Sequence, residues 1–287
     1  MTQLIRTVGE LRARLREARR AAKSIGLVPT MGALHEGHRS LIRRSVDENA
    51  LTAVSVFVNP TQFAPGEDIE KYPRPLADDL NACEDEGADV VFAPTPEEMY
   101  PEGFGTFVEV EGLGKVLCGR ARPTHFRGVT TVCAKLFGMT GADRAYFGEK
   151  DYQQLVIIRR MVADLDMPVG IVGCPIIREE SGLALSSRNA YLSEAERAEA
   201  LVLHRSLLEA KRLAGEAGVT RAAELTRAMR DVIAKAPQAE IDYVEVVDPE
   251  TLAPVDVLTA EARAMVAVRI GTTRLIDNLK ITPKGAT

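Results

Sequence analysis

The sequence predicts an α/β fold in two parts, a parallel sheet covered by helices on both faces and a smaller α+β domain at the C-terminal end. Short apolar runs alternate with stretches of helical periodicity, and the runs are nearly continuous, as is typical of strands buried on both faces. After about Gly182 the pattern changes to helices followed by β-patterned runs. The length of 287 residues suits one large domain or two smaller ones.

The first part alternates strands and helices in order. Candidate strands are residues 25–29, 53–59, 88–93, 144–147 and 169–177, and candidate helices lie near residues 38–49, 75–86, 127–139 and 151–165. A helix is also expected near the start of the chain, because Thr7 and Glu10 have capping-box spacing. Its apolar face comprises Leu11, Leu15, Ala18 and Ala22. The basic character of this segment also fits a transit peptide, but it runs into the first strand without a linker, which favours a folded helix.

The predicted domains are residues 1–182 and residues 183–287, the second a small lid. A second capping box, Ser193 with Glu196, begins a helix that extends to about residue 214, and another helix covers about residues 220–234. Two β-patterned runs follow, at residues 241–247 and 264–270. His204 lies between Leu201 and Leu208 on an apolar helical face, so we assign it to packing.

Composition excludes several classes of protein. The net charge of -5 gives no basic field for nucleic acid or an anionic membrane, and no apolar stretch approaches the roughly 20 residues of a membrane span. The cysteines are Cys83, Cys118, Cys133 and Cys174. They form no C-x-x-C pair, which argues against a zinc site, and their scatter fits a reducing compartment without disulfides.

The most informative segment is residues 29–38, Pro-Thr-Met-Gly-Ala-Leu-His-Glu-Gly-His. A strand, a turn and a helix start place free N–H groups and the helix dipole at one spot, which favours an anion. His35 and His38 fall on one helical face, and Gly37 lets a flat group approach the backbone. The pattern suits a nucleotide whose phosphates react. A metal-binding pair and a plain polar helix face remain the alternatives.

Other polar residues follow neighbouring strands at the same predicted edge of the sheet, where open α/β sheets bind ligands. They are Thr30 and His35, Asn59 and Gln62, and Gly148, Glu149, Lys150 and Asp151. Gly148 permits close approach of the backbone, and Lys150 offers a mobile positive charge. Asp151 could accept a hydrogen bond from a ribose hydroxyl or cap the following helix.

Three further segments allow two interpretations each. Residues 185–189, Leu-Ser-Ser-Arg-Asn, could clamp a polyphosphate or form a polar hinge. Arg122, His125 and Arg127 could hold an anion or brace a loop. The acidic run of residues 78–86 is interpreted as a solvated helix face, with Asp78 or Asp79 as a candidate magnesium contact.

Together these motifs resemble the pantothenate synthetase (pantoate–β-alanine ligase) family of the nucleotidyl transferase superfamily. The resemblance spans almost the whole chain and is carried by residues 29–38, 54–63, 72–74, 125–129, 147–154, 185–189 and 274–278. Class I aminoacyl-tRNA synthetases share the histidine-x-glycine-histidine signature, so the signature alone does not name the substrate. The departures are Ile69, where an aromatic residue is expected, and Ile177, where valine is usual.

The resemblance implies a Rossmann-like N-terminal domain and ATP-dependent condensation of (R)-pantoate with β-alanine. The products would be pantothenate, AMP and pyrophosphate, formed through an enzyme-bound pantoyl adenylate. It also implies Mg²⁺ with ATP, no tightly bound organic cofactor, no nucleic-acid or membrane partner, and a cytoplasmic homodimer.

The resemblance also implies roles for individual residues. His38, as proton donor, His35 and Lys150 would be catalytic, and Gln62 and Gln154 would bind pantoate, with Gln62 also bordering β-alanine. The ATP-binding residues would be Met31, Gly32, Ala33, Leu34, His35, Glu36, Gly37, His38, Gly148, Glu149, Lys150, Asp151, Ile177, Leu185, Ser186, Ser187 and Arg188. The metal ligands are not identified.

The rival interpretations make different predictions. Another adenylate- or cytidylate-forming transferase should lack the Gln62 and Gln154 pair. A nucleotide-binding regulator would bind ATP without turnover. A tRNA-binding protein would need a basic surface, which the net charge disfavours.

Overall fold

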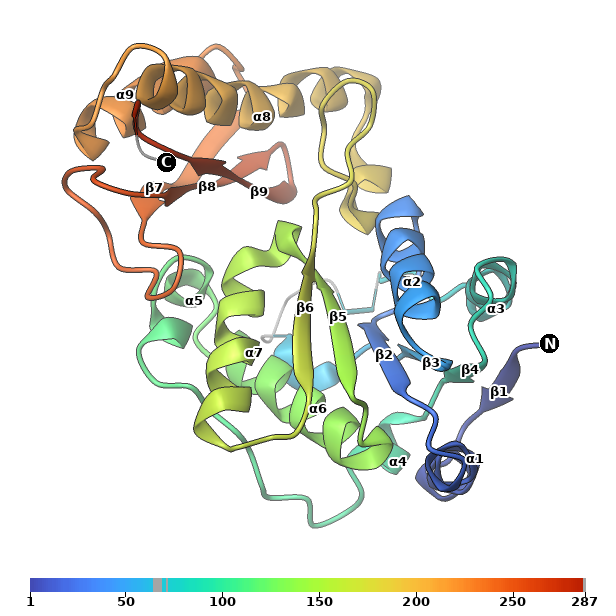
Figure 1. Cartoon of the computed structure of the whole chain (residues 1–287). Coiled ribbons are helices and arrows are strands. Elements are labelled where there is room, and N and C mark those ends of the chain that lie inside the picture. The colour runs from blue at the N-terminus through green and yellow to red at the C-terminus, as the bar shows by residue number, and fades with distance from the viewer. Residues whose placement is uncertain (64–68, 71, 286–287) are drawn as a thin grey trace. The chain divides into compact units, whose positions relative to one another are not determined.

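The computed structural model describes residues 1–63, 69–70 and 72–285 (Figure 1). The chain divides into two compact units. The first comprises Met1–Glu149 and Ile157–Pro175, and the second comprises Lys150–Val156 and Ile176–Thr287. The predicted fold class is confirmed, since one unit carries a parallel sheet and the other a small antiparallel sheet. The domain boundary after residue 182 stays a prediction.

The first unit is built on a parallel sheet of six strands. In sheet order these are β1 (Gln3–Ile5), β4 (Val90–Phe92), β3 (Leu51–Val56), β2 (Ile25–Thr30), β5 (Arg144–Gly148) and β6 (Gly170–Cys174). The chain moves outward from β2 through β3 on one side and from β5 on the other, so the strand order reverses between β2 and β5. Ligands of open α/β sheets bind outside the carboxyl ends of the strands at such a point.

The sequence pattern did not predict β1, and it predicted a strand longer than the observed β6. At three residues, β1 is too short to show a period, and it is recognisable only through its pairing with β4. The predicted strand at 169–177 ends in the structure at Cys174, because Pro175 has no N–H to continue a ladder.

Helices cover both faces of this sheet. The helices α2 (Glu36–Glu48) and α3 (Leu76–Asp85) share a core with β2 and β3 that includes Leu41, Cys83, Val28 and Val54. The helix α6 (His125–Thr140) lies on the other face, where the Phe137 ring centroid is 6.5 Å from that of Phe147.

The first helix, α1 (Val8–Arg20), packs on α6 and has the predicted capping box of Thr7 and Glu10. The expectation for Ala22 was wrong: the helix ends before it, and Ala22 is exposed with a φ of 52°. The apolar face therefore stops at Ala18. The remaining helical elements of the first unit are η1 (Pro60–Gln62), α4 (Pro96–Met99), η2 (Leu113–Lys115) and α5 (Cys118–Ala121).

The elements η3 (Glu149–Asp151) and α7 (Tyr152–Asp164) each contain residues of both units. The second unit contains η4 (Ser187–Tyr191), α8 (Glu194–Gly215), α9 (Ala222–Ile233) and an antiparallel sheet of β7 (Ala239–Val247), β8 (Ala262–Ile270) and β9 (Thr273–Ile281). The predicted Ser193 capping box begins α8. β9 was not predicted as a strand, because polar residues at 274, 277 and 278 hide its period.

The core of the second unit joins α8 and α9 to one face of the small sheet, with Leu203, Leu225 and Val268 fully or almost fully buried. His204 is half-buried and packs beside Gly182, as the packing assignment expects. Leu208, however, is 46% exposed and not part of a packed face. Burial, together with the nearby Arg178, lowers the pKa of His204.

The cysteines at 83, 118, 133 and 174 are free thiols in buried positions. Over the part of the chain that the structure describes, no helix has the length and apolar character needed to span a membrane.

Candidate active site

The loop after β2 turns sharply at the carboxyl edge of the sheet. The Thr30 hydroxyl donates to the Ser55 carbonyl at 2.7 Å and accepts from the Gly32 N–H at 3.2 Å. Gly32 and Ala33 then adopt φ values of 82° and 52°. A Cβ at Gly32 would lie 2.7 Å from an Asp79 carboxylate oxygen, so only glycine fits this turn without displacement.

Asp79 of α3 holds this loop. Its carboxylate accepts the N–H groups of Ala33 at 3.0 Å and Leu34 at 2.8 Å, and the residue is only 2% exposed. Burial raises the pKa of Asp79, and the hydrogen bonds from Leu34 and Ala33 oppose this rise only in part. The interpretation of the acidic run as a solvated face is therefore wrong for Asp79, whose carboxylate fixes the histidine loop. Asp78 is exposed.

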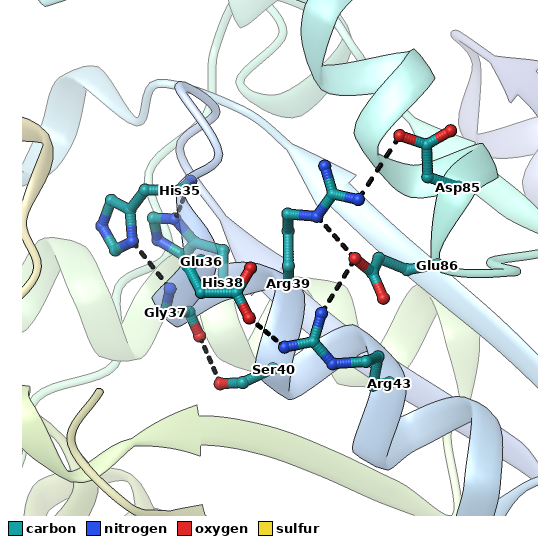
Figure 2. A network of polar contacts seen from close by, with 9 residues as sticks. All are labelled: His35, Glu36, Gly37, His38, Arg39, Ser40, Arg43, Asp85 and Glu86. Atoms are coloured by element: carbon teal, nitrogen blue, oxygen red, sulfur yellow. Dashed lines mark hydrogen bonds and ion pairs between the residues drawn. The ribbon is translucent and has the colours of Figure 1, made fainter. Parts of the chain in front are cut away.

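The two histidines cap the start of α2 reciprocally (Figure 2). Nδ1 of His35 accepts the Gly37 N–H at 3.1 Å, and Nδ1 of His38 accepts the His35 N–H at 3.4 Å. The ring centroids are 4.1 Å apart. Because both Nδ1 atoms accept, a neutral ring carries its proton on Nε2. Both imidazoles can thus act as N–H donors at a helix N-terminus, where the dipole favours an anion.

Ion pairs with Glu86 tie α2 to the end of α3 (Figure 2). One carboxylate oxygen of Glu86 accepts from Arg39 Nε at 2.5 Å and from Arg43 Nη1 at 2.9 Å. Arg39 also contacts Asp85 at 3.3 Å, and Arg43 also pairs with Glu36. Burial opposes ionisation of Glu86, but the two guanidinium groups outweigh it and hold its pKa below the ordinary value. Glu86 is a second member of the acidic run that is not simply a solvated charge.

Gln62 lies beside the histidine loop. Its Nε2 donates to Sδ of Met31 at 2.9 Å, and its Oε1 accepts from Asn59 Nδ2 at 3.1 Å. Asn59 in turn accepts a hydrogen bond from the Tyr100 hydroxyl at 2.7 Å. Both amides are buried. The structure therefore brings together two motifs that the sequence places on different strands.

The N-terminal part of α6 contacts this amide pair and the backbone that carries it. The Gly128 carbonyl accepts from Asn59 Nδ2 at 3.1 Å, and a Cβ at Gly128 would lie 2.4 Å from the Thr61 carbonyl oxygen. His125 Nδ1 and Arg122 Nη2 contact the Gln62 carbonyl oxygen at 2.9 and 3.3 Å. Of the two interpretations left open for Arg122 and His125, the structure shows the bracing contact.

Arg127 packs against an aromatic ring instead: its guanidinium carbon lies 3.8 Å from the centroid of the Phe107 ring. Sequence reasoning missed Tyr100 and the anchoring role of Asp79. Neither carries a local signal, because their partners are distant in the chain. Gly128 falls within a motif of the family resemblance, and a glycine near a helix start was the available hint.

The other predicted residues belong to the second unit, apart from Gly148 and Glu149. Lys150 follows β5 by two residues, and its Nζ lies 3.9 Å from Asp151 Oδ2. Gln154 is half-buried on α7. Residues 177–185 form a hairpin in which the Leu185 N–H donates to the Ile177 carbonyl at 3.0 Å, so these two residues lie side by side. Ser186 caps η4, which carries Ser187 and Arg188.

Residues 1–63, 69–70 and 72–285 contain no group of three or more His, Cys, Asp or Glu side chains arranged to hold a metal. The protein ligands of magnesium, which the family resemblance leaves unnamed, therefore stay unassigned.

Comparisons with known proteins cover nearly the whole chain. A family model described as pantoate-beta-alanine ligase matches residues 3–280. The chain is 52% identical to a pantothenate synthetase of Koribacter versatilis, over 99% of this chain and 97% of that protein. It is likewise 52% identical to a pantothenate synthetase of Geobacter sulfurreducens, over 96% and 97% of the two chains.

Solved structures agree. A pantothenate synthetase from Thermus thermophilus superimposes with a TM-score of 0.94 at 50% identity, covering 99% of this chain and all of that one. A pantoate-beta-alanine ligase from Francisella tularensis, complexed with Beta-gamma ATP and β-alanine, gives a TM-score of 0.81 at 33% identity over 97% of both chains. The motifs, the fold and these full-length similarities lead to one conclusion: the chain belongs to the pantoate–β-alanine ligase family of enzymes.

Proposed function

We propose that this enzyme joins (R)-pantoate to β-alanine through a pantoyl adenylate. A pantoate carboxylate oxygen attacks the α-phosphorus of ATP, the bond from that phosphorus to the bridging oxygen breaks, and pyrophosphate leaves. The β-alanine nitrogen then attacks the acyl carbon, AMP leaves with the bonding electrons, and the nitrogen loses a proton. Family membership supports the overall reaction, and the paired histidines at the start of α2 are the observation that carries the adenylation step.

His38 and His35 stabilise the negative charge that develops as pyrophosphate departs. Their reciprocal capping uses Nδ1 of each ring as an acceptor, so a neutral ring carries its proton on Nε2, and His38 is the proton donor to the leaving group. The positive end of the α2 dipole acts in the same direction. Asp79 serves this function indirectly, because it fixes the backbone of Ala33 and Leu34.

Lys150 provides the mobile positive charge for the phosphates. The remaining nucleotide contacts come from residues 31–38, from Gly148, Glu149 and Asp151, and from Ile177 and residues 185–188. Side-by-side placement of Ile177 and Leu185 supports a shared role for these two backbone segments. Burial of the adenylate would protect the mixed anhydride from water.

Gln62 and Gln154 bind pantoate, and Gln62 also borders the β-alanine site. Gln62 suits this role, because its buried amide is held between Met31 of the ATP segment and Asn59. An amide is a suitable partner for a hydroxylated carboxylate, to which it can both donate and offer an acceptor. The β-alanine present in the Francisella tularensis ligase structure supports a site for this amino acid in the family.

Mg²⁺ enters as part of the substrate, bound to the phosphates of ATP. Magnesium keeps several waters and is commonly held by substrate phosphates with few protein ligands, so a protein-built cage is not needed. We also infer a homodimer in the cytoplasm. The buried free cysteines suit a reducing compartment, and sedimentation of the purified chain tests the dimer.

The decisive experiment is pantoate-dependent exchange of labelled pyrophosphate into ATP, with magnesium present and β-alanine absent. A reversible adenylation half-reaction predicts exchange, and β-alanine added afterwards should yield pantothenate and AMP. A folded protein that makes pantothenate only when all three substrates are present, without exchange, would contradict the adenylate. Exchange supported by another carboxylic acid but not by pantoate would contradict the substrate assignment.

A further inference from the structure

The motif at residues 274–278, Arg-Leu-Ile-Asp-Asn, has no role in the proposed chemistry, yet two of its polar residues are buried in β9. Asp277 is 3% exposed and Asn278 is 1% exposed. Successive side chains of a strand point to opposite faces of the sheet. Asp277 shares its face with Leu275 and Ile281, which belong to the core formed with α8 and α9, so Asn278 points to the other face.

On the core side, Asp277 binds the hairpin of residues 177–185 through Arg178. The two carboxylate oxygens accept from Arg178 Nη1 at 2.6 Å and Nη2 at 2.9 Å, a bidentate pair. The Asn278 N–H donates to one of these oxygens at 2.7 Å and orients the carboxylate. Arg178 Nη1 also donates to the Gly182 carbonyl at 3.1 Å. One side chain of β9 thus fixes both the first arm and the turn of the hairpin.

The hairpin matters because its two ends, Ile177 and Leu185, carry proposed ATP contacts. The backbone bond between them makes their separation depend on the hairpin's shape. The segment after the hairpin is tied to it as well, since Asn189 Nδ2 donates to the Ala184 carbonyl at 3.0 Å. A displacement of Arg178 would therefore shift the backbone that presents Ser186, Ser187 and Arg188.

On the other face, Asn278 holds the turn that carries Lys150. Its Nδ2 donates to the Lys150 carbonyl at 3.0 Å, and its Oδ1 accepts from Arg263 Nη1 at 3.3 Å. The Arg263 guanidinium carbon lies 3.8 Å from the centroid of the Tyr152 ring. The amide therefore holds Lys150 and, through Arg263, Tyr152 at the start of α7.

We propose that Asp277 and Asn278 are positioning residues for ATP: from opposite faces of β9, one fixes the hairpin of residues 177–185 and the other fixes the Lys150 turn. The inference rests on the proposed function, because that function assigns both segments to ATP. A buried ion pair is weak support for stability on its own, since its desolvation cost can exceed its attraction. A role in placing the two segments accounts for the buried ion pair of Asp277 and for the buried Asn278 amide.

The test uses the whole chain, three variants and one control variant. Asn278→Ala removes both amide contacts, and Asn278→Asp keeps the acceptor for Arg263 but loses the donor to the Lys150 carbonyl. The double variant Arg178→Met with Asp277→Leu removes both charges together, which avoids leaving one buried charge unpaired. Val268→Ala is the control, because it weakens the core of the same sheet at a fully buried position in neither segment.

The readouts are peptide-resolved hydrogen exchange, calorimetric binding of a non-hydrolysable ATP analogue, and KM values in pyrophosphate exchange. Both Asn278 variants should exchange faster across residues 149–156, and the double variant across residues 176–188. Each should weaken analogue binding and raise the KM for ATP by about ten-fold, the scale of one lost buried hydrogen bond. The double variant, whose loosened segment contains no proposed pantoate residue, should leave the KM for pantoate nearly unchanged. Val268→Ala should lower the melting temperature without these effects.

The inference is overturned if the variants lose stability as Val268→Ala does but bind the analogue like the wild type. The inference would also be overturned if every variant exchanged at the wild-type rate in residues 149–156 and in residues 176–188. Failure of the proposed function looks different, because the wild-type chain would then show no pantoate-dependent exchange at all. Analogue binding and hydrogen exchange would still report on the two segments in that case.

Discussion

At the residue scale, the structure explains why two histidines occur three positions apart. Each Nδ1 accepts a backbone N–H that the start of a helix leaves without an intrahelical partner. The same contacts select the tautomer with its proton on Nε2. In the proposed mechanism, helix capping and phosphate chemistry use the same side chains through different ring nitrogens.

Replacement of His38 by alanine should slow adenylation by about two to four orders of magnitude, the usual scale for a positioned acid or charge-stabilising group. Pre-steady-state formation of the adenylate measures this step. Asp47→Ala, an exposed change on the same helix, serves as the control and should leave the rate unaltered. A folded His38→Ala protein with near-normal adenylation would rule out the assigned role.

Glu86 makes a prediction about pH. Because the folded protein holds the pKa of this carboxyl below its ordinary value of 4.5, its stabilising effect is complete above that pH and is lost as the pH falls through the lowered pKa. Glu86→Gln should therefore unfold more easily than the wild type at neutral pH. The gap in unfolding free energy should narrow as the pH drops below 4.5.

Urea denaturation at several pH values measures that gap. Glu84→Gln, on the exposed side of α3, is the matched control and should show a much smaller difference at neutral pH. A Glu86→Gln gap that stays constant down to strongly acid pH would show that the carboxylate's charge is not what stabilises α2.

At the element scale, the packing of α6 against η1 sets the position of the buried amide pair. Gly128→Ala would place a Cβ 2.4 Å from the Thr61 carbonyl oxygen and 2.6 Å from the Gln62 backbone. Overpacking of this kind should cost about 1–3 kcal/mol of stability. Because η1 would move, the KM for pantoate should also rise.

Gly138 of the same helix provides the control, since nothing lies within 4 Å of a Cβ there. Gly138→Ala should be neutral or stabilising by up to about 1 kcal/mol, because alanine favours a helix over glycine. Urea denaturation and steady-state kinetics compare the two variants. Similar losses of stability in Gly128→Ala and Gly138→Ala would mean that Gly128 is required for backbone flexibility and not for contact with η1.

At the scale of the whole molecule, each unit has its own hydrophobic core. Leu225 of α9 is fully buried in the second of these, so Leu225→Ala should cost about 2–5 kcal/mol through lost contacts and a cavity. Hydrogen exchange should accelerate first in α8, α9 and the small sheet.

Leu208→Ala on α8 is the comparison, because that side chain is 46% exposed. Its effect on the unfolding free energy should stay within about 0.5 kcal/mol, as for most surface changes. Chemical denaturation of both variants checks the pair of values. A large loss of unfolding free energy in Leu208→Ala would support the apolar face that the sequence pattern suggested around His204.

Several features of the fold could be predicted because they depend on local patterns. The near-continuous apolar runs predicted β2 to β5, and the spacings Thr7 to Glu10 and Ser193 to Glu196 predicted the starts of α1 and α8. Periodicity failed where an element was too short, as in β1, or carried buried polar residues, as in β9. In β9 the interruptions of the pattern are Asp277 and Asn278, the residues we propose to position ATP.

By itself the sequence determined the fold class, the helix caps and the family to which the chain belongs, because these follow from periodicity, spacing and ordered motifs. Only the tertiary structure decided which buried groups meet: Asp79 with the backbone of Ala33 and Leu34, Gln62 with Met31, and Asp277 with Arg178. The physical reason is that a buried polar group must find a partner, and that partner can lie anywhere along the chain. Sequence spacing reports neighbours within a turn or a strand, whereas these contacts join residues brought together only by the packing of separate elements.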